Sequence, residues 1–363
     1  MAANIEINNG VASFAENGRK ERAWHRLGQV FDRPMTVKEA LEASHADYSV
    51  SLQDVAMITP EIALAMSNGS VPTDLLLGAL VSGKKATMRT DKNKALGIVS
   101  SSYGMVQNLD AFTFIDTLCT GQVGGDHVPV IECAGVLGQG ERVFITAKFP
   151  EDIILDNKGD DKVEMYMMFT TSHDGMGSVK CVCTPIRTVC ENTLRCALTH
   201  NKGCLSLRHS SNIMQRLDLT SKENTEFAFR ALNLMSVYKK SLEQRFDHLR
   251  SIKLAEKDLD RILAEVALSE NDYKIYEQVG TVEHEDIGTR GRNQFLGMKL
   301  AVEQGVGQEY GERGTGLWLV NGITSFYQNH ADYRNEEIKL NSILNGNVAN
   351  KVMMACEAVE GSV

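Results

Sequence analysis

The chain has 363 residues, of which 43% are hydrophobic and 23% charged, an ordinary composition for a folded protein. This composition excludes general disorder, and no apolar run reaches the roughly 18 to 20 residues that a membrane-spanning helix needs. The first twenty residues lack the apolar core of a secretory signal. We therefore expect a cytoplasmic protein made of one large domain or two ordinary ones.

The net charge of −9 disfavours a general nucleic-acid binder, because phosphate contacts need lysine and arginine. The charge is nevertheless segregated along the chain. Six cations lie in the 37 residues from Lys180 to Arg216, where Glu191 is the only acid, an excess of +5. They are Lys180, Arg187, Arg195, Lys202, Arg208 and Arg216. A local basic surface is therefore compatible with the acidic whole.

Capping and periodicity signals predict the elements of the first third. Thr36 is expected to cap a helix from Val37 to about Ser44, because Glu39 completes a capping box. Extended segments are expected at 48–58 and 84–100, followed by an amphipathic helix that opens at Asn108 or Asp110.

The middle of the chain predicts an antiparallel sheet followed by a helix. Strands are expected at 130–137, 142–149, 163–171 and 178–184. Asp174-Gly175 predicts a tight hairpin, because both residues tolerate positive φ angles. Thr184-Pro185 predicts a helix from Ile186 to about Thr199, since threonine caps well and proline fits the first helical position. The expected fold class is α+β, with an antiparallel sheet, a β-β-β-α core and a long helical region after it.

Apolar residues recur at helical spacing between Leu219 and Leu268. They include Phe227, Leu234, Tyr238, Leu242, Phe246 and Leu249. This pattern is typical of a packing face, and a partner-binding zipper is the alternative. A glycine-rich loop at 305–316 precedes a last predicted helix from Trp318 to about Asn329. We expect an α+β core domain at 1–216, a helical region at 217–290, and C-terminal helices at 291–363 that pack on the core.

Several segments together resemble a phage- and plasmid-like protein family of unknown function (domain of unknown function 932). The resemblance covers nearly the whole chain. The matching segments are 23–28 (AWHRLG), 103–108 (YGMVQN), 171–175 (TSHDG), 184–194 (TPIRTVCENTL) and 314–318 (GTGLW) through Tyr327. This resemblance implies a setting on a mobile genetic element and no particular chemistry.

The predicted order of elements also resembles phage single-strand annealing proteins, which share a β-β-β-α core. In that family a basic helix and hairpin line a groove that holds stretched DNA. The resemblance implies ATP-independent binding of single-stranded DNA, with annealing of complementary strands as a further activity. It also implies a homo-oligomer in the form of a ring or filament.

Two basic clusters supply the candidate DNA contacts, because cations track phosphates and flat rings stack on bases. The candidate phosphate-binding residues are Lys84, Lys85, Arg89, Lys180, Arg187, Arg195, Lys202 and Arg208, and the candidate stacking residues are Trp24 and Tyr103. The alternative for the first cluster is a solvated loop. The alternative for Arg187 and Arg195 is an ion-pair ladder with Glu191 on one helical face.

Other chemistry has weaker support in the sequence. Cys181 and Cys183 are separated by one residue, which is too close for structural zinc, so we expect no metal and no other cofactor. Cys181, Cys183, Cys190 and Cys196 are expected to be buried apolar residues of a reducing compartment. His173-Asp174 is expected at a hairpin turn, and Cys190 is expected in a core rather than in an active site.

An enzyme is therefore not favoured, and no phosphate-binding loop for ATP is present. The alternative function is a protein-interaction module that modifies host metabolism or defence. It would use the helical stretch 219–268 as its contact surface.

Overall fold

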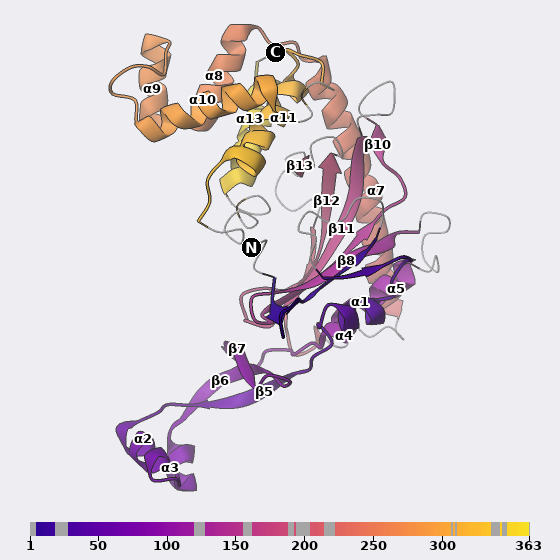
Figure 1. Cartoon of the computed structure of the whole chain (residues 1–363), viewed down its shortest axis with the longest axis vertical. Helices are drawn as coiled ribbons and strands as arrows, with labels where there is room; N and C mark the ends of the chain where they lie inside the picture. The colour runs from indigo at the N-terminus through magenta and orange to yellow at the C-terminus, as the bar shows by residue number, and fades with distance from the viewer. Residues whose placement is uncertain are drawn as a thin grey trace.

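A computed structural model describes residues 5–18, 28–119, 128–154, 162–187, 192–193, 204–213, 222–305, 308, 311–334, 342 and 347–362. The molecule is elongated (Figure 1). A sheet lies in the middle, a helical region lies beyond one end of it, and a narrow arm projects from the other end. The fold class is α+β, as predicted.

Within the described residues, the main sheet has nine strands. In order across the sheet they are β13 (Asn192–Thr193), β12 (Val179–Arg187), β11 (Lys162–Ser172), β9 (Arg142–Lys148), β8 (Val130–Leu137), β3 (Phe14–Asn17) and β4 (Gln29–Phe31). Two further strands pair at the sides, β10 (Ile153–Ile154) with β11 and β14 (Cys204–Leu207) with β12. Every pair is antiparallel except β3 with β4.

The predicted antiparallel pairings of this sheet are confirmed, but the connection at Asp174-Gly175 is longer than the expected tight turn, because β11 ends at Ser172 and β12 begins only at Val179. β8, β9 and β11 match the expected strands closely, and β11 pairs with β12 across a turn in which Gly175 has a φ of +76°. Along β9 and β11 every second side chain is buried, as alternation predicts for a sheet covered on one face. Helices α1 (Val37–Ala43), α4 (Asn108–Phe112), α5 (Phe114–Cys119) and α7 (Lys222–Ser251) pack in this part of the molecule.

The helix predicted from Ile186 is wrong where the structure describes it. β12 continues through Pro185 to Arg187, and Asn192–Thr193 form β13. Proline lacks an N–H, yet β14 leaves β12 at Val182 and β13 joins it only at Ile186. On the side of β12 that faces away from β11, Pro185 therefore has no described partner strand. Proline is tolerated at such a position, because no neighbouring strand there needs its missing N–H as a hydrogen-bond donor.

A second sheet forms the arm. β5 (Val50–Ala56), β6 (Leu80–Arg89) and β7 (Lys94–Ser100) pair in that order, and the connection from β5 to β6 carries α2 (Pro60–Ser67) and α3 (Thr73–Gly78). Two further features lie near the N-terminus. The capping box at Thr36 and Glu39 is confirmed at the start of α1. A short N-terminal ribbon, β1 (Ile7–Asn8) with β2 (Val11–Ala12), completes the described strands.

The helical region contains α8 (Glu256–Ala267), α9 (Glu270–Val279), α10 (Thr289–Gln304), α11 (Gly316–Ser325), a π-helical turn at Phe326–His330 and α13 (Asn347–Glu360). The predicted packing face of α7 is confirmed, since Tyr238, Leu242, Phe246 and Leu249 are all buried. Phe246 belongs to the core under the sheet, whereas Leu249 belongs to the core of the helical region. One helix therefore joins two apolar cores, and its stripe is not a free contact surface.

The two helices α10 and α11 approach closely at Gly322. A Cβ atom there would lie 2.4 Å from the Cα of Val302, which is backbone and cannot rotate away. We expect Gly322→Ala to lower the free energy of unfolding by about 1–3 kcal/mol through overpacking. Thermal unfolding followed by circular dichroism measures this, with Gly78→Ala in α3 as the control, because nothing lies within 4 Å of that added methyl group. Equal midpoints for the two variants would contradict the close packing.

Candidate nucleic-acid interface

The turn after β7 and the segment after β14 meet at the base of the arm. The ring of Tyr103 stacks on that of His209 with centroids 4.7 Å apart, and the Tyr103 hydroxyl donates to the Ser172 carbonyl at 3.1 Å. The Gly104 N–H donates to the His209 carbonyl at 3.1 Å. A side chain at 104 would meet the Ser210 carbonyl, so only glycine permits this approach. Burial lowers the pKa of His209 and raises that of Tyr103.

Two of the predicted cations gather at this junction. Lys180 on β12 lies opposite Ser206 on β14, and Arg208 follows that strand directly before the stacked His209. Arg208 is exposed and Lys180 is half-buried. Among the described residues, neither cation has a carboxylate within ion-pair distance. Lys180 and Arg208 are therefore available cations near the end of β14, and Arg208 is adjacent in the chain to His209, which covers one face of the Tyr103 ring.

The two adjacent lysines of the arm have different surroundings. Lys84 is exposed and lies opposite Ser100, close in the chain to Tyr103. Lys85 points to the other face of β6 and donates from Nζ to Asp54 at 2.6 Å. The strand partner of Lys84 is therefore only three residues before Tyr103 in the chain, whereas Lys85 already forms an ion pair.

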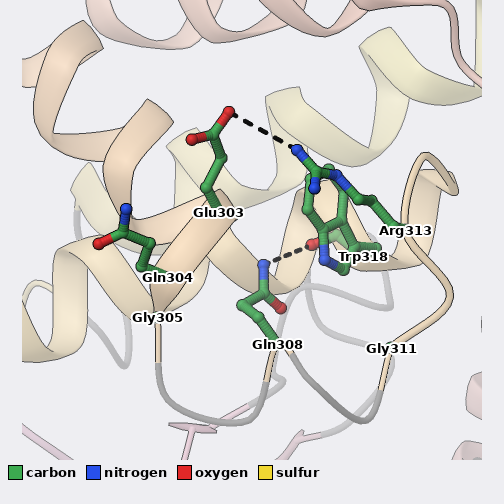
Figure 2. A pocket seen from close by; sticks show the side chains of 7 residues that line it. All are labelled: Glu303, Gln304, Gly305, Gln308, Gly311, Arg313 and Trp318. Atoms are coloured by element: carbon green, nitrogen blue, oxygen red, sulfur yellow. Dashed lines mark hydrogen bonds and ion pairs between the residues drawn. The ribbon is translucent and has the colours of Figure 1, made fainter.

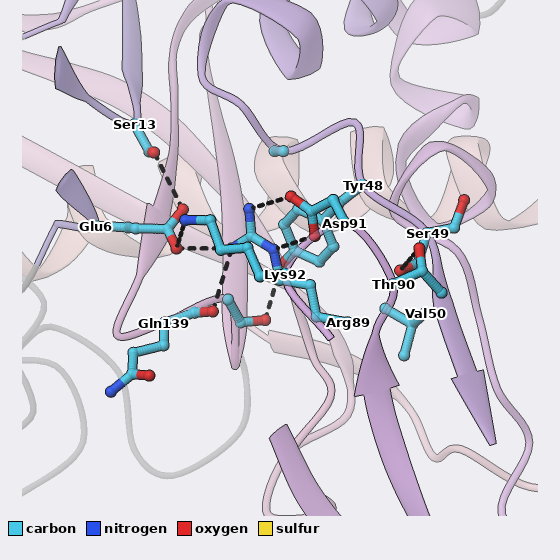
Figure 3. Close-up of polar contacts among 12 residues, drawn as sticks. Glu6, Ser13, Tyr48, Ser49, Val50, Arg89, Thr90, Asp91, Lys92 and Gln139 are labelled. Carbon is cyan, nitrogen blue, oxygen red and sulfur yellow. Dashed lines mark hydrogen bonds and ion pairs between the residues drawn. The ribbon is translucent and has the colours of Figure 1, made fainter. Parts of the chain in front are cut away.

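The prediction that Arg89 contacts phosphate is wrong. Its side chain is completely buried, and its guanidinium lies 3.8 Å from the centre of the Tyr48 ring (Figure 3). Nη1 donates to Glu6 at 2.7 Å and Nε donates to Asp91 at 2.8 Å. Burial opposes the charge of Arg89, but its bonds to Asp91 and Glu6 raise its pKa above the usual value. Arg89 fastens the arm to the N-terminal segment instead.

The remaining predicted contacts are not brought to the junction. Arg187 belongs to a strand, not to a basic helix, and it lies seven residues along β12 from Lys180. At about 3.3 Å per residue, the two Cα atoms are roughly 23 Å apart. Trp24, Arg195 and Lys202 lie outside the described residues.

A buried polar network that no sequence pattern predicted joins the arm to the main sheet. His173 is 1% exposed, and its Nε2 lies 2.7 Å from Oδ1 of Asn108, whose Nδ2 donates to the Ala46 carbonyl at 2.8 Å. The His173 carbonyl accepts from Thr87 on β6 at 2.5 Å. Burial is the main cause that lowers the pKa of His173, to about 4. The sequence held one indication of this contact. Asn108 belongs to the segment 103–108 and His173 to the segment 171–175, and both segments carry the family resemblance.

Asp174 has a structural role in the same turn. Its Oδ1 accepts from the Ser172 hydroxyl and from the Met176 N–H, each at 2.8 Å. A Cβ atom at Gly97 of β7 would lie 2.5 Å from the Asp174 carbonyl oxygen, so the hairpin turn packs directly on the arm. This turn therefore anchors the arm rather than presenting His173 to solvent.

The C-terminal motif 314–318 borders a hollow of about 420 Å³ (Figure 2). Arg313 lies 5.8 Å from the centre of the Trp318 ring and 3.9 Å from Glu303. Gln308 donates to the carbonyls of Val302 and Trp318. The motif itself is structural: Thr315 caps α11, and a Cβ at Gly316 would meet Val359 and the Leu249 carbonyl.

The described residues contain neither a cluster of metal ligands nor a helix that could span a membrane. No three His, Cys, Asp or Glu residues among them lie close enough together to hold a metal ion. No described helix has the length and apolar character needed to cross a bilayer. Cys181 and Cys183 are buried, as expected, whereas Cys190 and Cys196 fall outside the part that the structure describes.

Together these features define an α+β protein in which a three-stranded arm is anchored to a larger, mainly antiparallel sheet by buried polar contacts. Comparison with known protein families shows to which family the chain belongs. The family described as "Domain of unknown function (DUF932)" matches residues 95–347, and the chain belongs to it. A search of curated proteins and a search of solved structures each gave no match.

Proposed function

We propose that this protein binds single-stranded DNA without ATP, at the base of the arm, in the service of a phage or plasmid. The observations that support the proposal are the stack of Tyr103 on His209, the residue directly after Arg208, and the position of Lys180 opposite Ser206, on the strand that ends directly before Arg208. Cations that follow phosphates and a nearby ring are the parts that sequence-independent binding of single strands requires. Annealing of complementary strands is the proposed outcome of this binding, because bases stay accessible when the contacts are made to the backbone.

The charge of the junction sets the expected strength. The protein as a whole is acidic, so binding depends on a few local cations and weakens quickly as salt screens them. For single strands the logarithm of the binding constant falls with the logarithm of salt by about 0.7 for each phosphate neutralised. Removing two cations that contact phosphate should therefore reduce the slope by about 1.4.

The test is fluorescence anisotropy of a labelled single-stranded oligonucleotide across a salt series. We expect Lys180→Gln/Arg208→Gln to bind more weakly than the wild type and to show the shallower slope. The matched control is Lys38→Gln/Lys274→Gln, which removes two exposed cations from α1 and α9. No binding of the wild type at low salt would refute the proposal, as would equal slopes for the two double variants.

A second measurement addresses annealing. Complementary strands carrying a fluorophore and a quencher should pair faster with the wild type, in the absence of nucleotide, than with the Lys180→Gln/Arg208→Gln variant. If the protein binds the strands without accelerating their pairing, then its role is limited to binding.

A further inference from the structure

The end of the arm exposes an unusual amount of apolar surface. We call residues 57–80, which comprise α2, α3 and the chain around them, the apolar tip. Between 40% and 72% of the surface is exposed for each of Met57, Ile58, Leu64, Met66, Leu76 and Leu77. Soluble monomers rarely expose contiguous apolar patches larger than a few hundred Å².

The tip cannot cover this surface by itself. Its two helices have eight and six residues, and within 57–80 only Ile62 and Ala79 are buried. Figure 1 shows the helices at the far end of the arm, away from the sheet and from the helical region. Neither apolar core of the chain contains a residue from α2 or α3. The tip is thus held in solvent by the strands β5 and β6.

The charges of the tip exclude an anionic partner. Glu61 and Asp74 are the only charged residues from 57 to 80, so the tip has two acids and no lysine or arginine. Nucleic acid and anionic lipid surfaces both attract cations and repel such a surface. Both acids lie in the first turn of a helix, where the helix dipole favours them.

We propose that the apolar tip docks on the same tip of a second copy of the chain. A two-fold contact requires a patch that is complementary to itself, and a nearly uncharged patch of leucine and methionine side chains meets this requirement. Six large side chains exposed to this degree present several hundred Å², approaching the roughly 800 Å² that each partner contributes to a standard interface. Because the tip ends a narrow arm, two copies meet without their sheets colliding.

The proposal specifies the size of the oligomer. A two-fold contact between identical tips closes at two copies, whereas a ring or filament needs two different surfaces on each copy. The tip therefore gives a dimer, joined at the ends of the arms. This contact is independent of the DNA contacts proposed at the base of the arm.

Sedimentation velocity of the full chain over a concentration series tests the dimer. We expect the wild type to be dimeric at micromolar concentration and Leu64→Glu/Leu77→Glu to be monomeric, with a dissociation constant raised at least about 100-fold by the buried charges. The matched control is Leu296→Glu/Leu300→Glu on α10, whose side chains are exposed to a similar degree and lie in the helical region. Far-UV circular dichroism verifies that both variants remain folded.

Site-specific cross-linking gives a second, independent result. Ser67→Cys places a thiol at the end of α2, and a short bis-maleimide should join two chains at this site but not at Ser251→Cys on α7. A monomeric wild type at all concentrations overturns the proposal. A dimer that survives Leu64→Glu/Leu77→Glu, or one that only the α10 variant disrupts, overturns it as well, and so does co-flotation of monomeric wild type with anionic vesicles.

Discussion

Replacing Arg89 with methionine is expected to lower the free energy of unfolding by about 3 kcal/mol. Methionine fills much of the same volume but leaves the carboxylate of Glu6, which is only 6% exposed, without the guanidinium that bonds to it at 2.7 Å. Burial tends to raise the pKa of Glu6, yet the hydrogen bonds from Lys92 and Arg89 hold this pKa below its usual value. The expected loss of stability therefore arises because the buried carboxylate of Glu6 keeps only one cation, Lys92, as a partner.

The same strand supplies a control for this experiment. Lys85→Met removes a lysine that pairs with Asp54 near the surface, and exposed pairs contribute about 0–1 kcal/mol. Urea unfolding followed by far-UV circular dichroism compares the two variants, and a similar loss for both would contradict the role of Arg89. The double variant Glu6→Gln/Arg89→Met should recover part of the stability, because it leaves no charge buried without a partner.

The parts of the fold that the sequence predicted are those set by local chemistry. The capping box of α1 depends on Thr36 and Glu39, which are three residues apart and bond to each other. The strand at Val130–Leu137 ends where a glycine-containing turn begins, and Gly138 adopts a φ of +72°. The alternating burial along β9 and β11 is also local in origin, since each residue's face follows from its position in the strand.

The failures have a different origin, which is contact between distant segments. Arg89 resembles the surface lysines around it in sequence, but Glu6 lies 83 residues away and Tyr48 covers its guanidinium. Thr184-Pro185 carries a valid helix-start signal, yet pairing with β11 keeps these residues extended. Local propensity is weak compared with the hydrogen bonds and burial that a sheet provides.

The apolar tip could have been predicted in part. A stretch of 24 residues with only Glu61 and Asp74 charged is visible in the sequence. What composition could not supply is the position of this stretch at the end of an arm, where its side chains contact no core. An apolar segment is ordinarily expected to be buried within its own chain. In the proposed dimer, the apolar tip is buried instead against the tip of a second copy.

The free energy of unfolding is expected to fall as the pH is lowered from 7.5 to 5.0, because the folded protein holds the buried His173 neutral. Burial, and then the charges of His209 and Arg89, lower its pKa to about 4, while Asp174 opposes this shift. In the unfolded chain a histidine has a pKa of about 6.5, so the unfolded state binds more protons between these values. Stability is therefore fully present above about pH 6.5, and about 2 kcal/mol of it is lost at pH 5.0.

His173→Gln isolates this contribution, because an amide N–H can replace the histidine Nε2 as a donor to Asn108 and does not titrate. Urea unfolding of the wild type and of the variant at pH 7.5 and 5.0 gives the pH dependence of each. Carboxylates common to both proteins cancel in the difference, so the wild type should lose about 2 kcal/mol more than the variant over this interval. His248→Gln, which replaces a histidine at an exposed position on α7, is the matched control variant. Parallel losses in the wild type and in His173→Gln would mean that His173 takes up its proton without unfolding the junction.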